Sequence, residues 1–228
     1  MNQVSEELGL RDREHVFRDR RDAGILLAEM LREYGGSNAY ILAIPAGGVP
    51  VAKEMARLLS LRLDVAIARK VQLPDEPEAG FGAIGPDDVL VLNDDLIKDA
   101  RLTQDVIEKQ VLKARQSVRW REEIFRQNQP YPDLKRKIVI IVDDGLASGY
   151  TMLAVIRFAR ERGASKVIVA VPTASERGAE MMLQEADEVY VLNIRSGPVF
   201  AVAEAYEHWN DVSDEEALSI LQTSRSES

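Results

Sequence analysis

The 228-residue chain contains no cysteine, and this absence excludes several kinds of chemistry at once. Without a thiol, the protein has no cysteine nucleophile, no disulfide and no cysteine-ligated metal site. Histidine is almost as scarce, since only His15 and His208 could act as imidazole bases. The two lie far apart in the sequence, and we expect both to be surface or packing residues rather than catalysts.

Two further absences concern the partners of the protein. No apolar run approaches the ~20 residues that a membrane-spanning helix needs, and no signal-peptide pattern is visible, so we expect a cytoplasmic protein with no membrane partner. The net charge of −9 argues against general nucleic-acid binding. A basic set lies within residues 103–128, and we expect most of it to be solvated or to face a partner. Its members are Lys109, Lys113, Arg115, Arg119 and Arg121.

Hydrophobic residues make up 46% of the chain and occur in short, continuous runs. These runs alternate with helical patterns, which is typical of a parallel sheet covered by helices on both faces. The sequence therefore predicts an α/β fold with an open, mainly parallel sheet flanked by helices. Strands are expected within 39–50, 63–70, 89–94, 137–142, 165–175 and 188–194, and helices within 19–36, 51–60, 103–128, 150–160 and 175–186.

The organisation along the chain is that of one domain, over residues 15–221. We expect residues 1–14 to be mobile and residues 222–228 to form a polar tail. Residues 71–136 form an insertion that begins with a loop rich in proline, glycine and acid. The first predicted helix has Asp19 as its N-terminal cap. Its inward face is expected to carry Ile25, Leu26, Met30 and Leu31.

Two adjacent aspartates, Asp143 and Asp144, follow the apolar run at 137–142. Ligands of an open parallel sheet bind beyond the carboxyl ends of its strands, where these side chains would lie. Residues 145–151 follow and lead into a predicted helix, whose N-terminus attracts anions. Gly145 and Gly149 permit the backbone angles that turn N–H groups toward an anion.

The loop also offers the hydroxyl groups of Ser148 and Thr151. A sugar phosphate matches this stretch, because the loop would bind its phosphate and the carboxylates would accept hydrogen bonds from its hydroxyls. A P-loop needs a lysine where Tyr150 stands, and the three glycines of a dinucleotide fingerprint are lacking. A surface turn with a carboxylate helix cap stays an alternative, and we assign that role to the similar stretch at 89–95, which has no such loop after it.

The stretch "VIIVDDGLASGYT" at 139–151 resembles the phosphoribosyl pyrophosphate signature of type I phosphoribosyltransferases. Residues 17–31, 44–56, 63–70 and 212–217 extend the resemblance, over most of the chain, to a poorly characterised branch of that family. In that branch the loop at 45–50 usually carries an arginine where this chain has Ala46.

The resemblance implies a role for each matching residue. Asp143 and Asp144 would hold the ribose 2′- and 3′-hydroxyls and act as catalytic residues together with Lys70. The predicted 5′-phosphate loop comprises Gly145, Leu146, Ala147, Ser148, Gly149, Tyr150 and Thr151. The predicted pyrophosphate-binding residues are Ala46, Gly47, Gly48, Arg69 and Lys70. For these, a plain strand-to-helix turn and a solvated charge pair remain alternatives.

The resemblance is less complete for the residues that would bind the acceptor base. It implies a mobile flap at 71–86 and a small hood at 193–221, in which Phe200 would stack on a base, although a core aromatic is the alternative. Thr173 is a second candidate base-binding residue. The 6-oxopurine enzymes have an aspartate where this chain has Ala147, so their acid–base group is missing here.

The implied reaction transfers the 5-phosphoribosyl group from phosphoribosyl pyrophosphate to a nitrogenous base, with a purine-like base as one candidate. The implied cofactor is Mg²⁺, carried by the pyrophosphate and meeting Asp143 and Asp144 through water or the ribose rather than as direct ligands. A homodimer acting in nucleotide metabolism is expected. The alternative is a non-catalytic module that binds phosphoribosyl pyrophosphate or a nucleotide. A sugar-phosphate hydrolase fits less well, because no separate nucleophile or metal cluster is visible.

Overall fold

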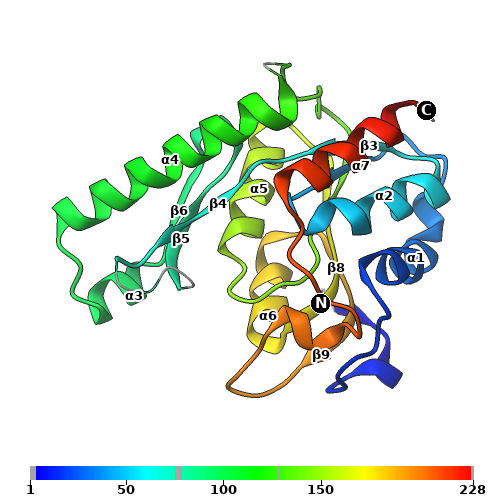
Figure 1. Cartoon of the computed structure of the whole chain (residues 1–228), viewed down its shortest axis with the longest axis horizontal. Coiled ribbons are helices and arrows are strands. Elements are labelled where there is room, and N and C mark those ends of the chain that lie inside the picture. Colours follow the sequence, from blue (N-terminus) through cyan, green and yellow to red (C-terminus); the bar gives the residue numbers. More distant parts are fainter. Residues whose placement is uncertain (1–3, 75, 77–78, 128, 227–228) are drawn as a thin grey trace.

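A six-stranded parallel sheet forms the centre of the computed structural model, which describes residues 4–74, 76, 79–127 and 129–226 (Figure 1). Its strand order is β1-β9-β8-β7-β2-β3, and every neighbouring pair runs parallel. The predicted α/β fold with an open parallel sheet is therefore confirmed. The strands are β1 (Val4–Glu6), β2 (Tyr40–Ala43), β3 (Arg62–Val65), β7 (Ile138–Val142), β8 (Lys166–Ser175) and β9 (Glu188–Arg195).

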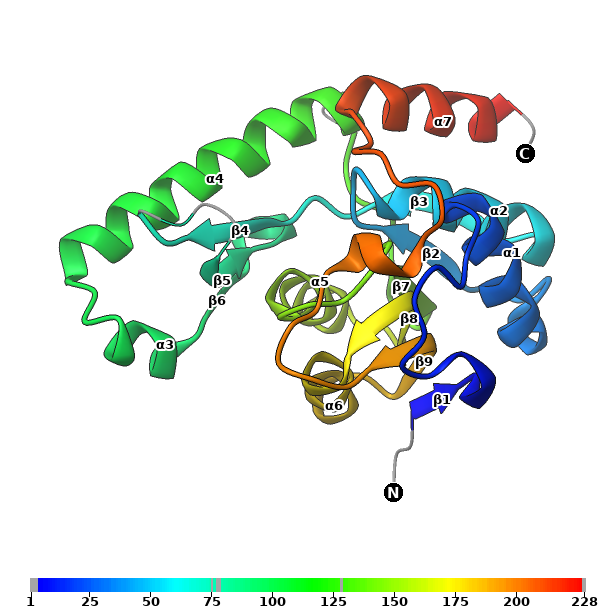
Figure 2. The same ribbon diagram turned by 60° about the horizontal axis from the view of Figure 1, so that its bottom comes forward.

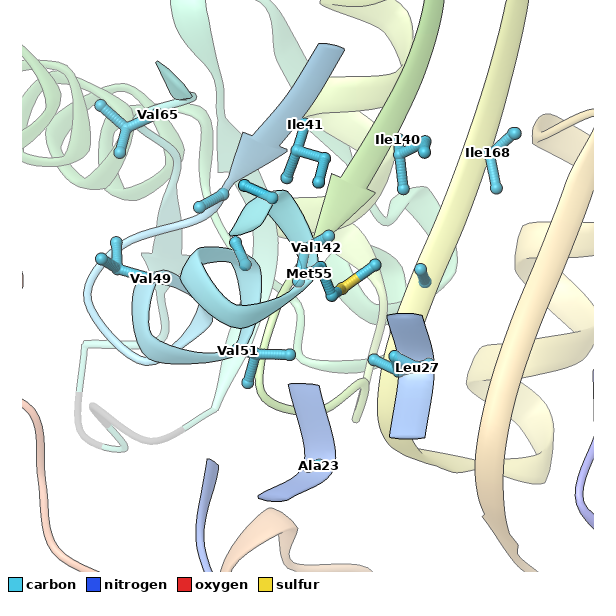
Figure 3. Close-up of a cluster of buried hydrophobic side chains, with 14 of the residues drawn as sticks. Ala23, Leu27, Ile41, Val49, Val51, Met55, Val65, Ile140, Val142 and Ile168 are labelled. Atoms are coloured by element: carbon cyan, nitrogen blue, oxygen red, sulfur yellow. The ribbon is translucent and has the colours of Figure 1, made fainter. Parts of the chain in front are cut away.

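Helices cover both faces of this sheet. Helices α1 (Arg20–Met30) and α2 (Gly48–Leu59) pack on one face, and α5 (Tyr150–Glu161) and α6 (Glu176–Glu185) pack on the other. Figure 3 shows the first face, where Leu27 and Met55 meet strand residues such as Ile140. Successive strand residues point to opposite faces, so Ile141 belongs to the second core. Two cores on two faces explain why the strands are continuously apolar.

The insertion forms an antiparallel sheet with two helices. Its strands are β4 (Arg69–Gln72), β5 (Gly80–Ile84) and β6 (Leu90–Leu92), followed by α3 (Asp94–Asp99) and α4 (Gln104–Arg126). In Figures 1 and 2 this unit extends to one side of the central sheet. The buried face of α4 carries Val111, Ala114, Val118 and Phe125. Residues 75 and 77–78 of the predicted flap, and residue 128, lie outside the described residues.

The strand predicted at 63–70 is corrected, because it is two strands in different sheets. β3 pairs with β2 only as far as the Val65–Ala43 pair, where β2 ends. The chain then passes to β4, in which Arg69 pairs with Ile84. Arg69 and Lys70 therefore begin a strand of the small sheet instead of closing a strand of the large one.

Both chain ends contain regular elements. Within the segment predicted to be mobile, Val4 pairs with Val189 of β9, and the side-chain amide of Asn193 donates to the carbonyls of Leu10 and Arg13. The predicted polar tail is helical up to residue 226, as part of α7 (Asp214–Ser226). Residues 1–3 and 227–228 of these two predictions lie outside the described residues.

The predicted hood at 193–221 does not correspond to one separate element. Residues 193–195 complete β9, and α7 packs against α2 with Ala217 and Leu221 buried. The part of the chain that the structure describes also contains the 3₁₀ turns η1 (Leu8–Leu10), η2 (Arg32–Tyr34), η3 (Pro86–Asp88) and η4 (Val202–Ala205). Among the described residues, no helix combines the length and the apolar character needed to cross a bilayer.

The predicted inward face of α1 is confirmed for Leu31, which is buried, and corrected for two other residues. Asp19 caps the helix as predicted, by accepting a hydrogen bond from the Asp22 N–H. However, Ile25 is 37% exposed and Leu26 is 38% exposed. The helix instead meets α2 through a narrow stripe that includes Gly24, where an added Cβ would lie 2.5 Å from the Val51 carbonyl oxygen. Close approach of two helices requires small residues at the contact, so the bulkier neighbours turn outward.

Candidate functional site

The strands β2 and β7 lie side by side in the sheet and mark the point where its strand order reverses. From β2 the chain continues to β3 on one side, and from β7 it continues to β8 on the other. The helices that follow, α2 and α5, cover opposite faces. The loops after the two strands therefore diverge, and a crevice at such a point is the usual ligand site of an open α/β sheet.

The two predicted glycine loops meet at this crevice. A Cβ built on Gly47 would stand 2.0 Å from Oδ2 of Asp144, and one built on Gly48 would stand 2.7 Å from the Val142 carbonyl oxygen. No other residue type fits at such distances without movement of the chain. The structure thus brings the predicted pyrophosphate loop and the double aspartate into direct contact, although they lie far apart in sequence.

The predicted phosphate loop presents free backbone donors. The N–H groups of residues 147–151 donate to no acceptor among the residues that the structure describes. Gly149 is the N-cap of α5 with φ of +79°, a conformation that glycine adopts without strain. Ala147 and Ser148 are exposed and Thr151 is half-buried. The loop therefore combines several N–H groups with the positive end of a helix, as an anion site requires.

Leu146 differs from the other residues of this loop. Its N–H donates to the Thr173 carbonyl oxygen at 2.9 Å, and its side chain is buried in the core. The donor is already used in joining the loop to the end of β8. Leu146 consequently anchors the loop, and its N–H cannot bind a phosphate without breaking that bond.

The two aspartates differ in their surroundings. The backbone N–H of Asp144 donates to Oδ1 of Asp143 at 2.9 Å, and Nε of Arg20 donates to Oδ2 of Asp144 at 2.8 Å. Although Asp143 keeps some exposed surface, desolvation by the surrounding protein raises its pKa well above the ordinary value, and the charge of Asp144 raises it further. Arg20 lowers it in part. The crevice therefore holds one carboxylate paired with a cation and one that ionises reluctantly.

The segment after β9 packs against the aspartates. The Tyr206 hydroxyl donates to the backbone oxygen of Asp144 at 2.6 Å, and the Arg20 guanidinium lies 3.9 Å from the centroid of the Trp209 ring. A Cβ on Gly145 would stand 2.4 Å from Cγ1 of Val202. Residues 202–210 thus form one wall beside the double aspartate.

A second cation, Arg121, reaches the crevice from α4. Its side chain is buried, its Nη1 donates to the Pro45 carbonyl oxygen at 3.2 Å, and its guanidinium forms a two-pronged ion pair with Asp214 of α7. This corrects the expectation that Arg121 is solvated or faces a partner. Arg69 lies near this pair, and its pKa is lowered by desolvation and by the charge of Arg121, although its side chain keeps exposed surface.

The remaining predicted residues occupy different surroundings. Lys70 is exposed and lies opposite Ala83 in the small sheet. Phe200 is half-buried in the loop after β9. Thr173 is wholly buried, and its Oγ1 donates to Oδ1 of Asn193 at 2.8 Å, so its side chain does not reach the surface of the crevice. A base-binding role for Thr173 stays a prediction, which the burial of its side chain does not favour.

Three residues of the site are not indicated by the sequence: Arg20, Tyr206 and Trp209. Arg20 and Asp144 are 124 positions apart, and nothing in the local pattern "DRRD" distinguishes an arginine that turns inward from one that faces solvent. The expected surface position of the two histidines is confirmed, since His15 and His208 are both exposed.

The double aspartate at the end of β6 serves as an internal comparison. Asn93 caps α3 by accepting a hydrogen bond from the Leu96 N–H, and Asp94 and Asp95 form the first helical turn. The predicted carboxylate cap is instead the amide of Asn93, and the two acids lie in the first turn, where they favour the positive end of the helix.

A cavity of about 530 Å³ lies elsewhere, beneath α4 and beside η3. Its walls include the ion pairs Arg115–Asp88 and Arg162–Asp87, and none of the predicted site residues line it. Two of its cations are held in ion pairs, and the cavity lies away from both glycine loops. The crevice at the switch point, which gathers free N–H donors and two carboxylates, remains the candidate site.

The chain matches the family model described as "Phosphoribosyl transferase domain" over residues 20–209. It is 40% identical over 209 residues to "Putative phosphoribosyl transferase Rv0571c" of Mycobacterium tuberculosis strain H37Rv, a match that covers 90% of this chain and 46% of that protein. A second strain, CDC 1551, has a relative with the same figures. The chain thus spans about half the length of the curated relatives it matches.

Among solved structures, the chain is similar to the crystal structure of TT1426 from Thermus thermophilus. The TM-score is 0.74 and the identity is 38%, and the match covers 91% of this chain and 98% of that one.

Proposed function

The chain belongs to the phosphoribosyl transferase domain family, and from that premise we propose that it transfers the 5-phosphoribosyl group of phosphoribosyl pyrophosphate to a nitrogenous base. The bond between the anomeric carbon and the pyrophosphate oxygen breaks, and pyrophosphate leaves with the bonding electron pair. A nitrogen of the base forms the new bond and loses its proton. The observation that carries the proposal is the contact between the two loops at the switch point, where Gly47 packs against Asp144.

The phosphoribosyl half of the substrate fits the loop after β7. The free N–H groups of residues 147–151 and the N-terminus of α5 would hold the 5′-phosphate. Asp143 and Asp144 would accept hydrogen bonds from the ribose hydroxyls. Positive charge develops on the ribose as the bond breaks, and two fixed carboxylates next to the sugar would stabilise that charge.

The pyrophosphate half fits the loop after β2. The N–H groups of Ala46 and Gly47 donate to no described acceptor, and α2 begins immediately after them. Arg69 and Lys70 would neutralise the leaving group, and Arg121 would add positive charge behind the loop. Holding the sugar and the leaving group in fixed positions reduces the entropic part of the barrier.

The carboxylate oxygens of Asp143 and Asp144 at the crevice suit a Mg²⁺ ion that arrives with the substrate. Carboxylate oxygens are the ligands this ion prefers, and it usually keeps several waters when it binds to phosphates. Within the described residues, no group of three or more acidic or histidine side chains could hold a metal ion without help. Asp143 and Asp144 would therefore meet the ion through water or the ribose, and the ion would neutralise charge on the pyrophosphate.

The acceptor would lie against the loop after β9, with Phe200 stacked on the ring of the base. A half-buried aromatic side chain in a loop retains the exposed face that stacking needs. We further propose a homodimer, which the large exposed apolar side chains of Leu112 and Trp120 on α4 support.

A second candidate function is a non-catalytic module that binds phosphoribosyl pyrophosphate or a nucleotide. The observations that favour it are the missing cation at Ala46 and the engagement of Arg121 with Asp214. In addition, position 147 of the loop is an alanine, so no acid stands there to exchange a proton with a base.

One experiment distinguishes the two functions. The protein is incubated with Mg²⁺ and phosphoribosyl pyrophosphate, and a panel of nucleobases is screened for base-dependent release of pyrophosphate. The transferase requires release with at least one base, and the paired variant Asp143→Asn with Asp144→Asn should abolish it. Tight calorimetric binding of phosphoribosyl pyrophosphate with no release for any base would establish the binding module instead.

A further inference from the structure

Arg20 is a buried arginine that joins two parts of the crevice. It stands in the first turn of α1 and is 7% exposed. Its Nε donates to Oδ2 of Asp144 at 2.8 Å, and its Nη1 donates to the Asn210 carbonyl oxygen at 2.8 Å. Its guanidinium lies over the ring of Trp209. One side chain therefore contacts both a proposed ribose carboxylate and the segment after β9.

Tyr206 forms a second link between the same two parts. Its hydroxyl donates to the backbone oxygen of Asp144 at 2.6 Å, and its ring centroid lies 5.3 Å from that of Trp209. The side chain of Asp144 is thus held through Arg20, and its main chain is held through Tyr206. We call Arg20, Asp144, Tyr206 and Trp209 the Arg20 cluster.

Asp144 keeps acceptor capacity in spite of these contacts. The Asp144 side chain is 16% exposed, and no described residue donates to its Oδ1. A carboxylate offers about four acceptor positions, so ribose hydroxyls can donate to Oδ1 while Arg20 remains at Oδ2. A purely structural ion pair deep in the core would not expose a second oxygen at the crevice.

The Arg20 cluster also places a positive charge beside two adjacent acids. Asp143 and Asp144 are adjacent acids, and like charges at this separation oppose each other's ionisation. Arg20 supplies a counter-charge, with its Nε 2.8 Å from Oδ2 of Asp144. Ribose hydroxyls that donate to Oδ1 share the negative charge of the same carboxylate. The attraction between Asp144 and the Arg20 guanidinium, which lies next to the Trp209 indole, is then weaker.

We infer that Arg20 is a positioning residue that presents Oδ1 of Asp144 to a ribose diol and transmits occupancy of the ribose site to Trp209. This inference rests on the proposed function. The segment 202–210 lies just after Phe200, so the coupling extends from the ribose site to the wall beside the proposed acceptor site. Because coupling free energies are reciprocal, a ligand on that wall would change ribose affinity by the same factor.

Trp209 provides the readout. The chain has two tryptophans, and Trp120 is 56% exposed on α4, so a Trp120→Phe variant leaves Trp209 as the single tryptophan. This variant is titrated with ribose 5-phosphate and, separately, with inorganic phosphate, while fluorescence and calorimetry are recorded. Ribose 5-phosphate should change the Trp209 emission. Inorganic phosphate should bind the same loop without that change, because it has no hydroxyls to reach Asp144.

Two Arg20 variants in the same background separate positioning from support of the fold. Arg20→Gln should abolish the emission change and weaken ribose 5-phosphate binding by about tenfold or more, as loss of a hydrogen bond between charged groups does, with phosphate binding unchanged. Arg20→Lys keeps the charge beside Asp144 but loses the flat stack on Trp209. It should restore much of the affinity and little of the emission change. Thermal unfolding checks that each variant is folded, and Arg20→Lys serves alone if Arg20→Gln is not.

The inference and the proposed function fail in different ways. If the Trp120→Phe protein binds ribose 5-phosphate by calorimetry while the Trp209 emission stays constant, Arg20 does not transmit occupancy and the inference is wrong, but the proposed function stands. Normal ribose 5-phosphate affinity in Arg20→Gln would equally overturn it. Absence of calorimetric binding for both ribose 5-phosphate and phosphoribosyl pyrophosphate would remove the proposed function and the inference with it.

Discussion

The α-carbon of Gly47 packs directly against the carboxylate of Asp144, so that a methyl group on Gly47 would stand 2.0 Å from Oδ2 of that side chain. The contact joins the loops of two neighbouring strands, β2 and β7, whose sequences are far apart. It also places the proposed pyrophosphate and ribose subsites side by side. A diphosphate bonded to a ribose needs such an arrangement, because the anomeric carbon must lie between them.

This contact predicts the effect of Gly47→Ala. The added methyl group must displace Asp144 or the loop, and overpacking of this kind costs about 1–3 kcal/mol. We expect lower thermal stability and a larger loss of phosphoribosyl pyrophosphate affinity, measured by calorimetry. Gly9→Ala is the matched control, because the nearest atom to its Cβ would be a glutamate oxygen at 3.6 Å. Equal affinity in the two variants would contradict the close contact.

The raised pKa of Asp143 predicts how stability depends on pH. Its pKa is raised by burial and by Asp144, so the folded state holds its proton more tightly than the unfolded state does. The contribution is fully present below the ordinary pKa of about 3.9 and is lost as pH rises through the raised pKa. Asp143→Asn cannot lose a proton and should lack that decline. Urea unfolding at several pH values from about 4 to 8 would measure it.

The two other charges facing Asp143 provide the control for this prediction. Removing the charge of Asp144 by Asp144→Asn should lower the pKa of Asp143 and move the decline to lower pH. Removing the cation by Arg20→Gln should raise the pKa of Asp143 and move the decline to higher pH, since Arg20 favours the ionised form. A free-energy difference between Asp143→Asn and the unchanged protein that is constant with pH would show that Asp143 titrates normally.

Much of the fold, and the position of the two glycine loops at one edge of the sheet, could be predicted from the sequence. Continuous apolar strands and a glycine loop after Asp143 and Asp144 are local patterns, and local patterns record sheet type and helix starts directly. The loops at 46–48 and 143–151 could be placed at one crevice because parallel strands end at the same edge of the sheet. Gly47 and Gly149 then take the positions that only a close approach or a positive φ explains.

The features that escaped prediction depend on contacts between distant parts of the chain. Arg20 and Arg121 look like ordinary surface cations of amphipathic helices, yet both are buried because Asp144 and Asp214 lie opposite them. The burial of Thr173 similarly depends on Asn193 in the next strand. No spacing along the chain encodes such pairs, since each partner comes from another element.

The contact between Gly145 and Val202 predicts a compensating pair of substitutions. A Cβ on Gly145 would stand 2.4 Å from one methyl carbon of Val202 and 2.5 Å from the other. Gly145→Ala should therefore lower stability and ribose 5-phosphate affinity, and Val202→Ala in the same protein should restore part of both. A double-mutant cycle measures the restoration as an interaction energy. Strict additivity would mean that the loss arises from the backbone of the loop and not from Val202.

The proposed stacking of Phe200 on the base predicts a kinetic effect that is confined to the acceptor. If its ring stacks on the base, Phe200→Ala should raise the KM for the base and leave the KM for phosphoribosyl pyrophosphate unchanged. Loss of base stacking on an aromatic side chain typically costs about 1–3 kcal/mol, or roughly 5- to 150-fold in affinity. Val199→Ala is the control, since Val199 is 76% exposed in the same loop. Similar KM values for Phe200→Ala and the control would remove Phe200 from the base site.

The contacts of Arg121 predict that this residue contributes separately to stability and to pyrophosphate binding. Arg121→Gln leaves Asp214 without its partner, and breaking a buried ion pair in this way costs up to about 3–5 kcal/mol. The cost should be smaller here because Asp214 keeps 23% of its side chain exposed. The same change removes the donor to the Pro45 carbonyl and the positive charge behind Ala46, so we also expect weaker binding of pyrophosphate, measured by calorimetry.

A second substitution, at Asp214, distinguishes the effect on stability from the effect on pyrophosphate binding. Combining Arg121→Gln with Asp214→Asn removes both charges, so thermal stability should recover while pyrophosphate binding remains weak. Arg119→Gln is the matched control on α4, because Arg119 is exposed and its loss should change neither quantity. If pyrophosphate affinity recovered together with stability, Arg121 would serve only to neutralise Asp214, and the positive charge at the pyrophosphate loop would come from Arg69 and Lys70 alone.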